Sequence, residues 1–187
     1  MRAPRPSPIR SWWSSIRRAY PVTLIELPRR GAFGGADSPE LASRIRSAIP
    51  AGGTPIIIGG HSRGAVVASQ LAAGSPELLA GLVIIGSSHP RDHDLSALRI
   101  PVVKIVGTRD GLASPAEVRQ NATLLPAHTR WIWVEGGNHS QFGWYGFQPM
   151  DRWPRIDASA QRAMMIQGTL ELLATVAAGE PAVEHEP

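Results

Sequence analysis

Cysteine is absent from this sequence of 187 residues. Disulfide bonds, cysteine-based zinc sites and thiol catalysis are therefore excluded, although the absence does not report the compartment. Long apolar runs are also missing, since no segment reaches the ~18 apolar residues that span a bilayer. No apolar stretch follows the first arginines, so the start is not a signal peptide. We expect a cytoplasmic protein without a membrane span, unless a targeting or anchor segment lies upstream of the sequence.

Lysine is also scarce, because Lys104 is the only one in the chain. The net charge of +4 is unevenly distributed: residues 1–30 hold seven arginines and one glutamate, a net +6, and the rest of the chain is slightly acidic. Nucleic-acid binding needs Lys and Arg clustered on a folded face. We therefore predict no nucleic-acid partner. The sequence leaves the oligomeric state open.

The composition is that of a folded chain, with 43% hydrophobic and 18% charged residues. A chain of this length fits one domain. We place that domain at residues 10–178. Residues 1–9 are basic and rich in proline, which predicts a disordered lead-in, and residues 179–187 form a polar tail.

Apolar, β-branched runs alternate along the chain with segments of helical periodicity. We expect strands at residues 22–27, 56–58, 82–85, 102–106 and 131–134. We expect helices at residues 10–19, 39–48, 65–73 and 115–124, and a long one with apolar positions from Ile156 to Val176. This alternation predicts an α/β fold with a mostly parallel sheet covered by helices on both faces. Ligands of such sheets bind beyond the carboxyl ends of the strands.

The exit of the strand at residues 56–58 carries the motif G-x-S-x-G, formed by Gly60, Ser62 and Gly64. An apolar strand precedes the motif and a helix follows it, which is the context of a nucleophile elbow. We expect both glycines to be needed because a Cβ at either position would clash with neighbouring backbone. The serine hydroxyl would then stand exposed above the sheet. The alternative is an ordinary strand-to-helix turn with a capping serine.

Two later strand exits carry Asp110 and His139. Each alone has an ordinary interpretation, as a turn aspartate and a surface histidine. Together with Ser62 they follow the order Ser, Asp, His of a catalytic triad. A histidine titrates near neutral pH and takes the serine proton, while an aspartate holds its tautomer. Asp92 and Asp94 are reserve candidates for the acid.

Three segments, Gly59–Ala65, Gly107–Gly111 and Glu135–Gly146, resemble the α/β-hydrolase superfamily over roughly residues 10–178. The likeness is to a bacterial group in its small, lidless, dienelactone-hydrolase-like branch, and the stretch E-G-G-N-H-x-Q-F-G-x-Y-G is its most specific part. The resemblance implies Ser62 as nucleophile, Asp110 as acid and His139 as base. It also implies hydrolysis of an ester or related carbonyl compound without a cofactor.

The backbone N–H of Arg63 would supply half of the oxyanion hole. The other half should come from a strand and Gly-rich loop before the helix at residues 10–19, and residues 1–9 offer neither. In the family this strand lies between those at residues 22–27 and 56–58, so its loss would leave a gap inside the sheet. We expect that the natural chain starts further upstream, so that the fold is N-terminally truncated here. The alternative is a sheet that closes up around an impaired site.

The short segment between Ile85 and Pro101 leaves no room for a lid, which predicts an open site and a small-molecule substrate. Its histidines and aspartates predict a solvated loop and no metal. The Arg63 side chain either points outward or meets an anionic substrate group. The aromatic residues after His139 either cover the last strand and final helix or form a substrate pocket, for which the candidates are Phe142, Trp144 and Tyr145.

The leading hypothesis is a serine hydrolase of a small ester, lactone or thioester. The alternative is a non-catalytic or impaired α/β-hydrolase-like fragment that lacks half of the oxyanion hole. Acyl transfer or peptide hydrolysis on the same triad also stays open, because fold and triad do not fix the acceptor.

Overall fold

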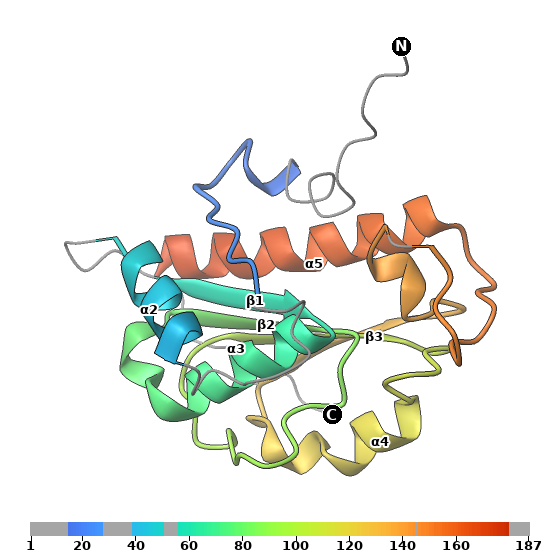
Figure 1. Cartoon of the computed structure of the whole chain (residues 1–187), viewed down its shortest axis with the longest axis horizontal. Coiled ribbons are helices and arrows are strands. Elements are labelled where there is room, and N and C mark those ends of the chain that lie inside the picture. The colour runs from blue at the N-terminus through green and yellow to red at the C-terminus, as the bar shows by residue number, and fades with distance from the viewer. Residues whose placement is uncertain (1–14, 28–38, 51–55, 145, 180–187) are drawn as a thin grey trace.

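The structure of the chain is a computed structural model, which describes residues 15–27, 39–50, 56–144 and 146–179 (Figure 1). Four strands form one parallel sheet in the order β1-β2-β3-β4. Their bounds are β1 Ile57–His61, β2 Gly81–Ile85, β3 Val102–Gly107 and β4 Arg130–Val134. The expected α/β fold with a parallel sheet is therefore confirmed.

Helices cover both faces of this sheet (Figure 1). Their bounds are α2 Pro39–Ala48, α3 Arg63–Gly74, α4 Pro115–Gln120 and α5 Ala158–Ala178. Within the described residues, short 3-10 turns lie in the connections between helices and strands. They are η2 Pro76–Leu78, η3 Ala122–Leu124 and η4 Ser140–Phe142. Figure 1 shows α5 along one face and α3 and α4 along the other.

The two faces of β2 show why the sheet needs both layers. Its side chains alternate in direction with a period of two residues, and all five residues of the strand are buried. Val83 and Ile85 join the cluster that includes Met165 of α5. Leu82 and Ile84 join the cluster that includes Ala68 of α3. A continuous apolar run is therefore what a strand covered on both sides requires.

Residues 22–27, expected to form a strand, are not one. They do not pair with the sheet, which in the described part of the chain ends at β1. Three of their side chains contact the core: Val22 lies against the α5-side cluster, and Ile25 and Leu27 lie against the cluster that contains Leu41 of α2. An apolar pattern alone does not distinguish these two uses.

The other expected elements agree with the structure to within a few residues. The helix expected at residues 115–124 is divided into α4 and η3, and Ser114 caps α4 in a capping box with Glu117. Of the helix expected at residues 10–19, residues 15–16 are helical and residues 10–14 lie outside the described residues. The lead-in at residues 1–9 and residues 180–187 of the tail also lie outside the described residues. The segment between β2 and β3 holds no helix or strand, as expected for a chain without a lid there.

Candidate active site

Ser62 occupies the turn between β1 and α3 in a backbone conformation that L-residues rarely adopt, with φ 53° and ψ −116°. Its N–H donates to Ile85 O on the neighbouring strand at 2.9 Å, which ties the turn to β2. A strained backbone at a strand-to-helix turn is the expected geometry of a nucleophile elbow.

The two glycines of the G-x-S-x-G motif have different roles. A Cβ added to Gly60 would lie within 3.0 Å of Gly64 carbonyl atoms and 2.6 Å from Ala65 N, so no side chain fits there. A Cβ added to Gly64 would meet nothing within 4 Å in the described part of the chain, its own helix aside. The expectation of a clash at both positions is therefore right for Gly60 and wrong for Gly64.

Arg63 begins α3 directly after Ser62. The first backbone donors of the helix are Ala65 and Val66, and both donate to Ser62 O. The N–H of Arg63 precedes these bonds, as required of an oxyanion donor at a helix N-terminus. The Arg63 side chain is exposed, which agrees with the interpretation that it points outward. Residues 1–9, in which the sequence offers no loop for the second donor, lie outside the described residues.

Asp110 and His139 meet as a buried pair. Asp110 Oδ2 lies 2.9 Å from His139 Nδ1, and the exposed fractions of the two side chains are 0% and 3%. Asp110 Oδ1 accepts from Leu112 N at 2.9 Å and Ala113 N at 2.7 Å, so the carboxylate cannot rotate away without losing these bonds. Because a carboxylate accepts, Nδ1 of a neutral His139 carries the proton and Nε2 is left as the acceptor. Asp94, a reserve candidate, accepts from Ser96 N instead.

The loop after β3, which carries Asp110, and the loop after β4, which carries His139, approach each other closely through their backbones. A Cβ added to Gly107 would lie 2.5 Å from Gly137 O, and Arg109 N donates to that same oxygen at 2.8 Å. Gly136 N donates to Thr108 Oγ1 at 2.9 Å. The absence of a side chain at Gly107 therefore lets the histidine loop lie directly on the end of β3.

Asn138 and Gln161 fix the histidine loop to α5, a pairing that the sequence pattern did not predict. Gln161 accepts from Asn138 N at 3.0 Å and donates to Asn138 O at 2.7 Å. Gln161 is fully buried and shares its helix face with Met165 and Leu172. A polar residue in an otherwise apolar stripe was the available signal for this contact.

His61 lies beside the pair, although its place in the motif predicted no role for it. The centroid of its ring is 4.6 Å from that of His139 and 5.8 Å from that of Phe142. Desolvation lowers the pKa of His61 to about 3, and the charge of protonated His139 adds to the effect. His61 is therefore neutral near pH 7.

The three pocket candidates have different surroundings. Phe142 is fully buried in the core beneath α5, as expected of a cover for the last strand. Trp144 is half exposed and packs under the guanidinium of Arg162 at 4.1 Å. Tyr145 lies outside the described residues.

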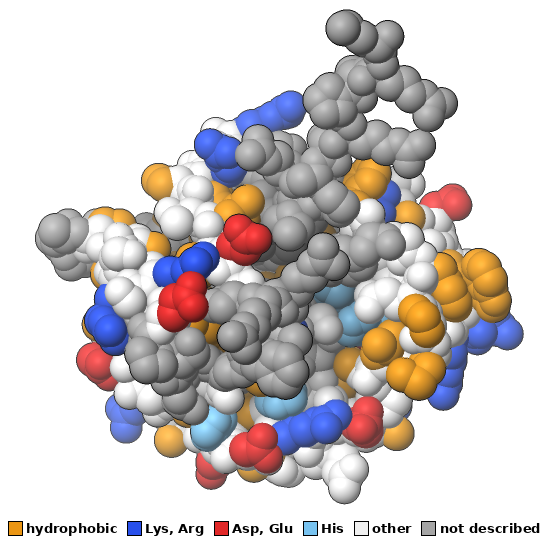
Figure 2. All heavy atoms as spheres, in the orientation of Figure 1, with side chains coloured by type: hydrophobic (Ala, Val, Ile, Leu, Met, Phe, Trp, Pro, Cys, Tyr) orange, Lys and Arg blue, Asp and Glu red, His pale blue; other side chains and the backbone are white. Residues whose placement is uncertain are grey.

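Phe147 and Trp153 are exposed and stacked with ring centroids 4.4 Å apart. Figure 2 shows hydrophobic side chains gathered on the side where the β4–α5 loop lies.

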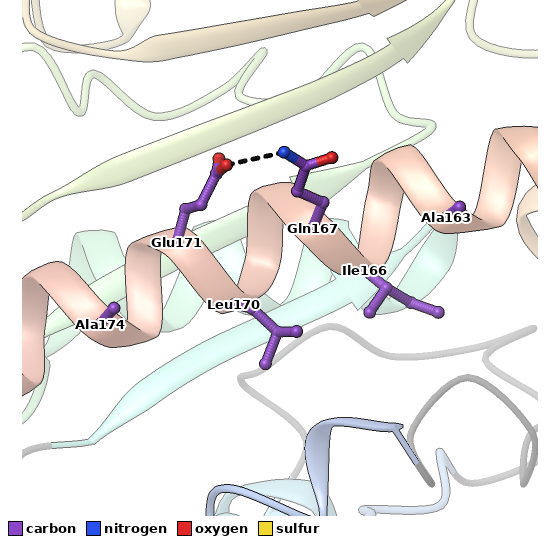
Figure 3. Close-up of a pocket in the computed structure, with 6 residues that line it drawn as sticks. All are labelled: Ala163, Ile166, Gln167, Leu170, Glu171 and Ala174. Atoms are coloured by element: carbon purple, nitrogen blue, oxygen red, sulfur yellow. Dashed lines mark hydrogen bonds between the residues drawn. The ribbon is translucent and has the colours of Figure 1, made fainter.

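Two surface hollows lie away from the pair. One, of about 450 Å³, follows the outer side of α5 and is lined by Ala163, Ile166, Gln167, Leu170, Glu171 and Ala174 (Figure 3). The other is lined by residues 17–22. Neither includes Ser62, Asp110 or His139. Among the described residues no group of three or more His, Asp or Glu side chains is placed to hold a metal ion.

A family model described as "Alpha/beta hydrolase family" matches residues 13–163. The chain belongs to this family. No described helix of this α/β hydrolase is long and apolar enough to cross a membrane. No curated protein matches its sequence. Its placement in the dienelactone-hydrolase-like branch stays a prediction.

Solved structures agree with the family. A YdeN-like hydrolase from Pectobacterium atrosepticum has a TM-score of 0.58 and 20% identity, covering 90% of this chain and 87% of that one. A CIB-like hydrolase from Thermoplasma acidophilum has a TM-score of 0.52 and 16% identity, covering 72% of this chain. This chain spans only 56% of the Thermoplasma protein. The monoacylglycerol lipase of Paleococcus ferrophilus has a TM-score of 0.51 and 17% identity, with coverages of 74% and 77%. At these identities the likeness shows the fold alone.

Proposed function

We propose that this α/β hydrolase cleaves a small ester, lactone or thioester with Ser62 as nucleophile, His139 as base and Asp110 as the acid that orients it. The buried bond between Asp110 and His139 carries the proposal, because it leaves Nε2 of the imidazole free to act as a base. Ser62 in its strained elbow supplies the nucleophile that such a base requires.

The reaction follows from these groups. His139 Nε2 takes the proton of Ser62 Oγ as that oxygen attacks the substrate carbonyl. The negative charge that develops on the carbonyl oxygen is stabilised by the N–H of Arg63. His139 then gives its proton to the leaving alcohol or thiol, and an acyl-enzyme remains. Water, deprotonated by His139, attacks the acyl carbonyl and regenerates Ser62.

Asp110 acts through the electrostatics of the imidazole. The imidazolium formed during the reaction lies 2.9 Å from a carboxylate in a site from which water is excluded, so their attraction is only weakly screened. The backbone donors of Leu112 and Ala113 hold the carboxylate in place, and in a triad the acid orients the imidazole without taking its proton.

A small carboxylic ester is the substrate class that these observations favour. The segment between β2 and β3 forms no lid, and the loop after His139 carries the half-exposed Trp144, whereas Phe142 is buried. One structural neighbour is named as a monoacylglycerol lipase, an enzyme of the carboxylic ester class. Acyl transfer to an acceptor other than water would use the same acyl-enzyme.

The first experiment compares the wild type with Ser62→Ala on p-nitrophenyl butyrate. The rate should fall by a factor of about 10⁴ or more, because a triad acts as a unit. Ser47→Ala is the matched control: its hydroxyl is exposed on α2 and donates to Arg44 O. A fluorophosphonate probe should add to the wild type at Ser62 and to the control, but not to Ser62→Ala. Equal rates in all three proteins would eliminate the proposal.

The alternative, a non-catalytic or impaired fragment, makes a different prediction in the same experiment. A chain that lacks half of its oxyanion hole loses about 2.7–4 kcal/mol of transition-state stabilisation, or a factor of about 10²–10³. Ester turnover would then be weak in the wild type.

A further inference from the structure

We propose that Asp151 is a positioning residue that holds the loop of His139 against the loop of Asp110. The inference rests on the proposed function, since the two loops carry its acid and its base. Asp151 lies in the segment between β4 and α5, outside every motif of the sequence.

The Asp151 carboxylate accepts hydrogen bonds from both loops. On the side of the acid, Gly111 N donates to Oδ1 at 3.0 Å, one residue after Asp110. On the side of the base, His139 N donates to Oδ1 at 3.3 Å and Ser140 N to Oδ2 at 2.8 Å. Two further donors complete the set, Ser140 Oγ at 2.6 Å and Arg152 N at 2.9 Å.

Packing around Gly111 shows that this contact is built into the fold. A Cβ added to Gly111 would lie 2.9 Å from the Cα of Asp151 and closer still to Met150 O. The acid loop therefore lies directly on the backbone of residues 150–152. The same segment is held from the other side, because Asn138 Nδ2 donates to Arg152 O at 2.8 Å.

Only a carboxylate satisfies these donors. It has two oxygens and no hydrogen, whereas the amide of asparagine turns one of its two ends into a donor. Because five donors surround the Asp151 side chain, the NH₂ group of an asparagine would face donors and find no acceptor among them. Burial alone would raise the pKa of Asp151, but the hydrogen bonds from Ser140, Gly111 and Arg152 outweigh it, and the pKa lies below its ordinary value. Asp151 is thus charged wherever the base is able to work.

The consequence for catalysis is geometric. The His139 backbone N–H is one of the five donors, so the carboxylate fixes the main chain from which the imidazole projects. A displacement of about 1 Å in a catalytic group costs about 100-fold in rate. Asp151 touches neither the substrate nor Ser62 in this scheme, and its effect passes through the position of His139.

Asp151→Asn tests the inference, with Asp157→Asn as the control. Asp157 lies in the same segment between β4 and α5, is exposed, and makes no side-chain capping bond to α5. In Asp151→Asn, kcat should fall about 100-fold while KM stays within about twofold, at a temperature well below the melting transition. The downfield proton resonance of His139 Nδ1–H, bonded to Asp110, should shift or broaden. The control should match the wild type in both measurements.

An Asp151→Asn variant that melts earlier but keeps the wild-type kcat and Nδ1–H resonance would overturn the inference. If that variant does not fold, Ser140→Ala decides, because it removes the hydroxyl donor to Asp151 and leaves the backbone donors of both loops in place; it also removes the acceptor of Gln148 N. A fall in kcat without a change in KM then supports the positioning role, and a wild-type kcat contradicts it. The Nδ1–H resonance needs no turnover, so the result stands even if Ser62→Ala shows that the proposed reaction is wrong.

Discussion

Gly60→Ala should break the turn that presents Ser62, whereas Gly64→Ala on the other side of the same motif should not. The Cβ added at position 60 would lie 2.6 Å from Ala65 N and within 3.0 Å of the Gly64 carbonyl group. Ordinary contact distances are about 3.5–4.0 Å, so the first turn of α3 would need to move by roughly 1 Å. The atoms in the way belong to the backbone and not to the end of a flexible side chain.

The cost can be estimated from that overlap. Forcing extra atoms into a packed interior costs typically 1–3 kcal/mol, and we expect the upper end, about 3 kcal/mol, because a helix start must move. Ser62, in the same turn, already holds a strained backbone conformation. A shift of about 1 Å at the nucleophile should also lower kcat by about 100-fold.

Gly64→Ala introduces the same methyl group into open space. Its Cβ meets nothing within 4 Å among the described residues outside its helix. Alanine is favoured over glycine inside a helix by about 0.5–1 kcal/mol, so the free energy of unfolding should be unchanged or rise. The two variants, Gly60→Ala and Gly64→Ala, thus add the same methyl group at the two glycines of one motif.

Urea unfolding and the turnover of p-nitrophenyl butyrate measure both effects. Gly60→Ala with wild-type stability and kcat would refute the steric argument. A loss in Gly64→Ala as large as that in Gly60→Ala would also refute it, since it would mean that both glycines are needed for the same reason.

Three further predictions concern buried polar groups. Burial lowers the pKa of Lys104 to about 7, so between about pH 7.5 and 9 the unfolded chain binds a proton that the folded chain does not. The free energy of unfolding should then rise by up to about 1.4 kcal/mol per pH unit, and Lys104→Met should remove this slope in urea titrations. Asp110→Asn should lower kcat about 10⁴-fold with little change in melting temperature, because the imidazole loses its orienting acceptor; a loss under tenfold would contradict the assigned role. Gln161→Ala leaves the buried N–H and C=O of Asn138 without their partner and should lower the free energy of unfolding by about 2 kcal/mol in urea. Gln167→Ala on the exposed side of α5 should lower it by less than about 0.5 kcal/mol. Equal losses in the two variants would contradict the role of the Gln161 contact.

The fold was predictable because its strands carry a strong local signal. A run such as Gly81–Ile85 is apolar at nearly every position, which is typical of a short strand buried on both faces. Residues 22–27 carry a similar signal and yet do not pair. Pairing depends on which edge is available, a property of the whole sheet that a single segment does not contain.

The candidate site was predictable where its chemistry is tied to a motif. Ser62, Asp110 and His139 each follow a recognisable strand, and their order along the chain is the order of the triad on this fold. Asp151 has no such signal, because its partner Gly111 is 40 positions away and the chain between them holds a strand. A carboxylate that bridges two loops becomes visible only when both loops are placed.

The site consists of two halves with separate supports. Asp110 and His139 are held together by Asp151, Gln161 and the close backbone approach at Gly107, all from the second half of the chain. Ser62 depends on the contact of Gly60 with α3 and on the bond to Ile85. The ring of His61 is where the halves meet, since it belongs to the strand before Ser62 and lies 4.6 Å from the ring of His139. Variants that touch different halves should therefore differ in their effect on the Nδ1–H resonance of His139. Gly60→Ala should lower turnover and leave the Nδ1–H resonance of His139 unchanged, whereas Asp151→Asn should alter both. A perturbed resonance in Gly60→Ala would mean that the elbow and the acid–base pair form one cooperative unit, and would assign the coupling to His61.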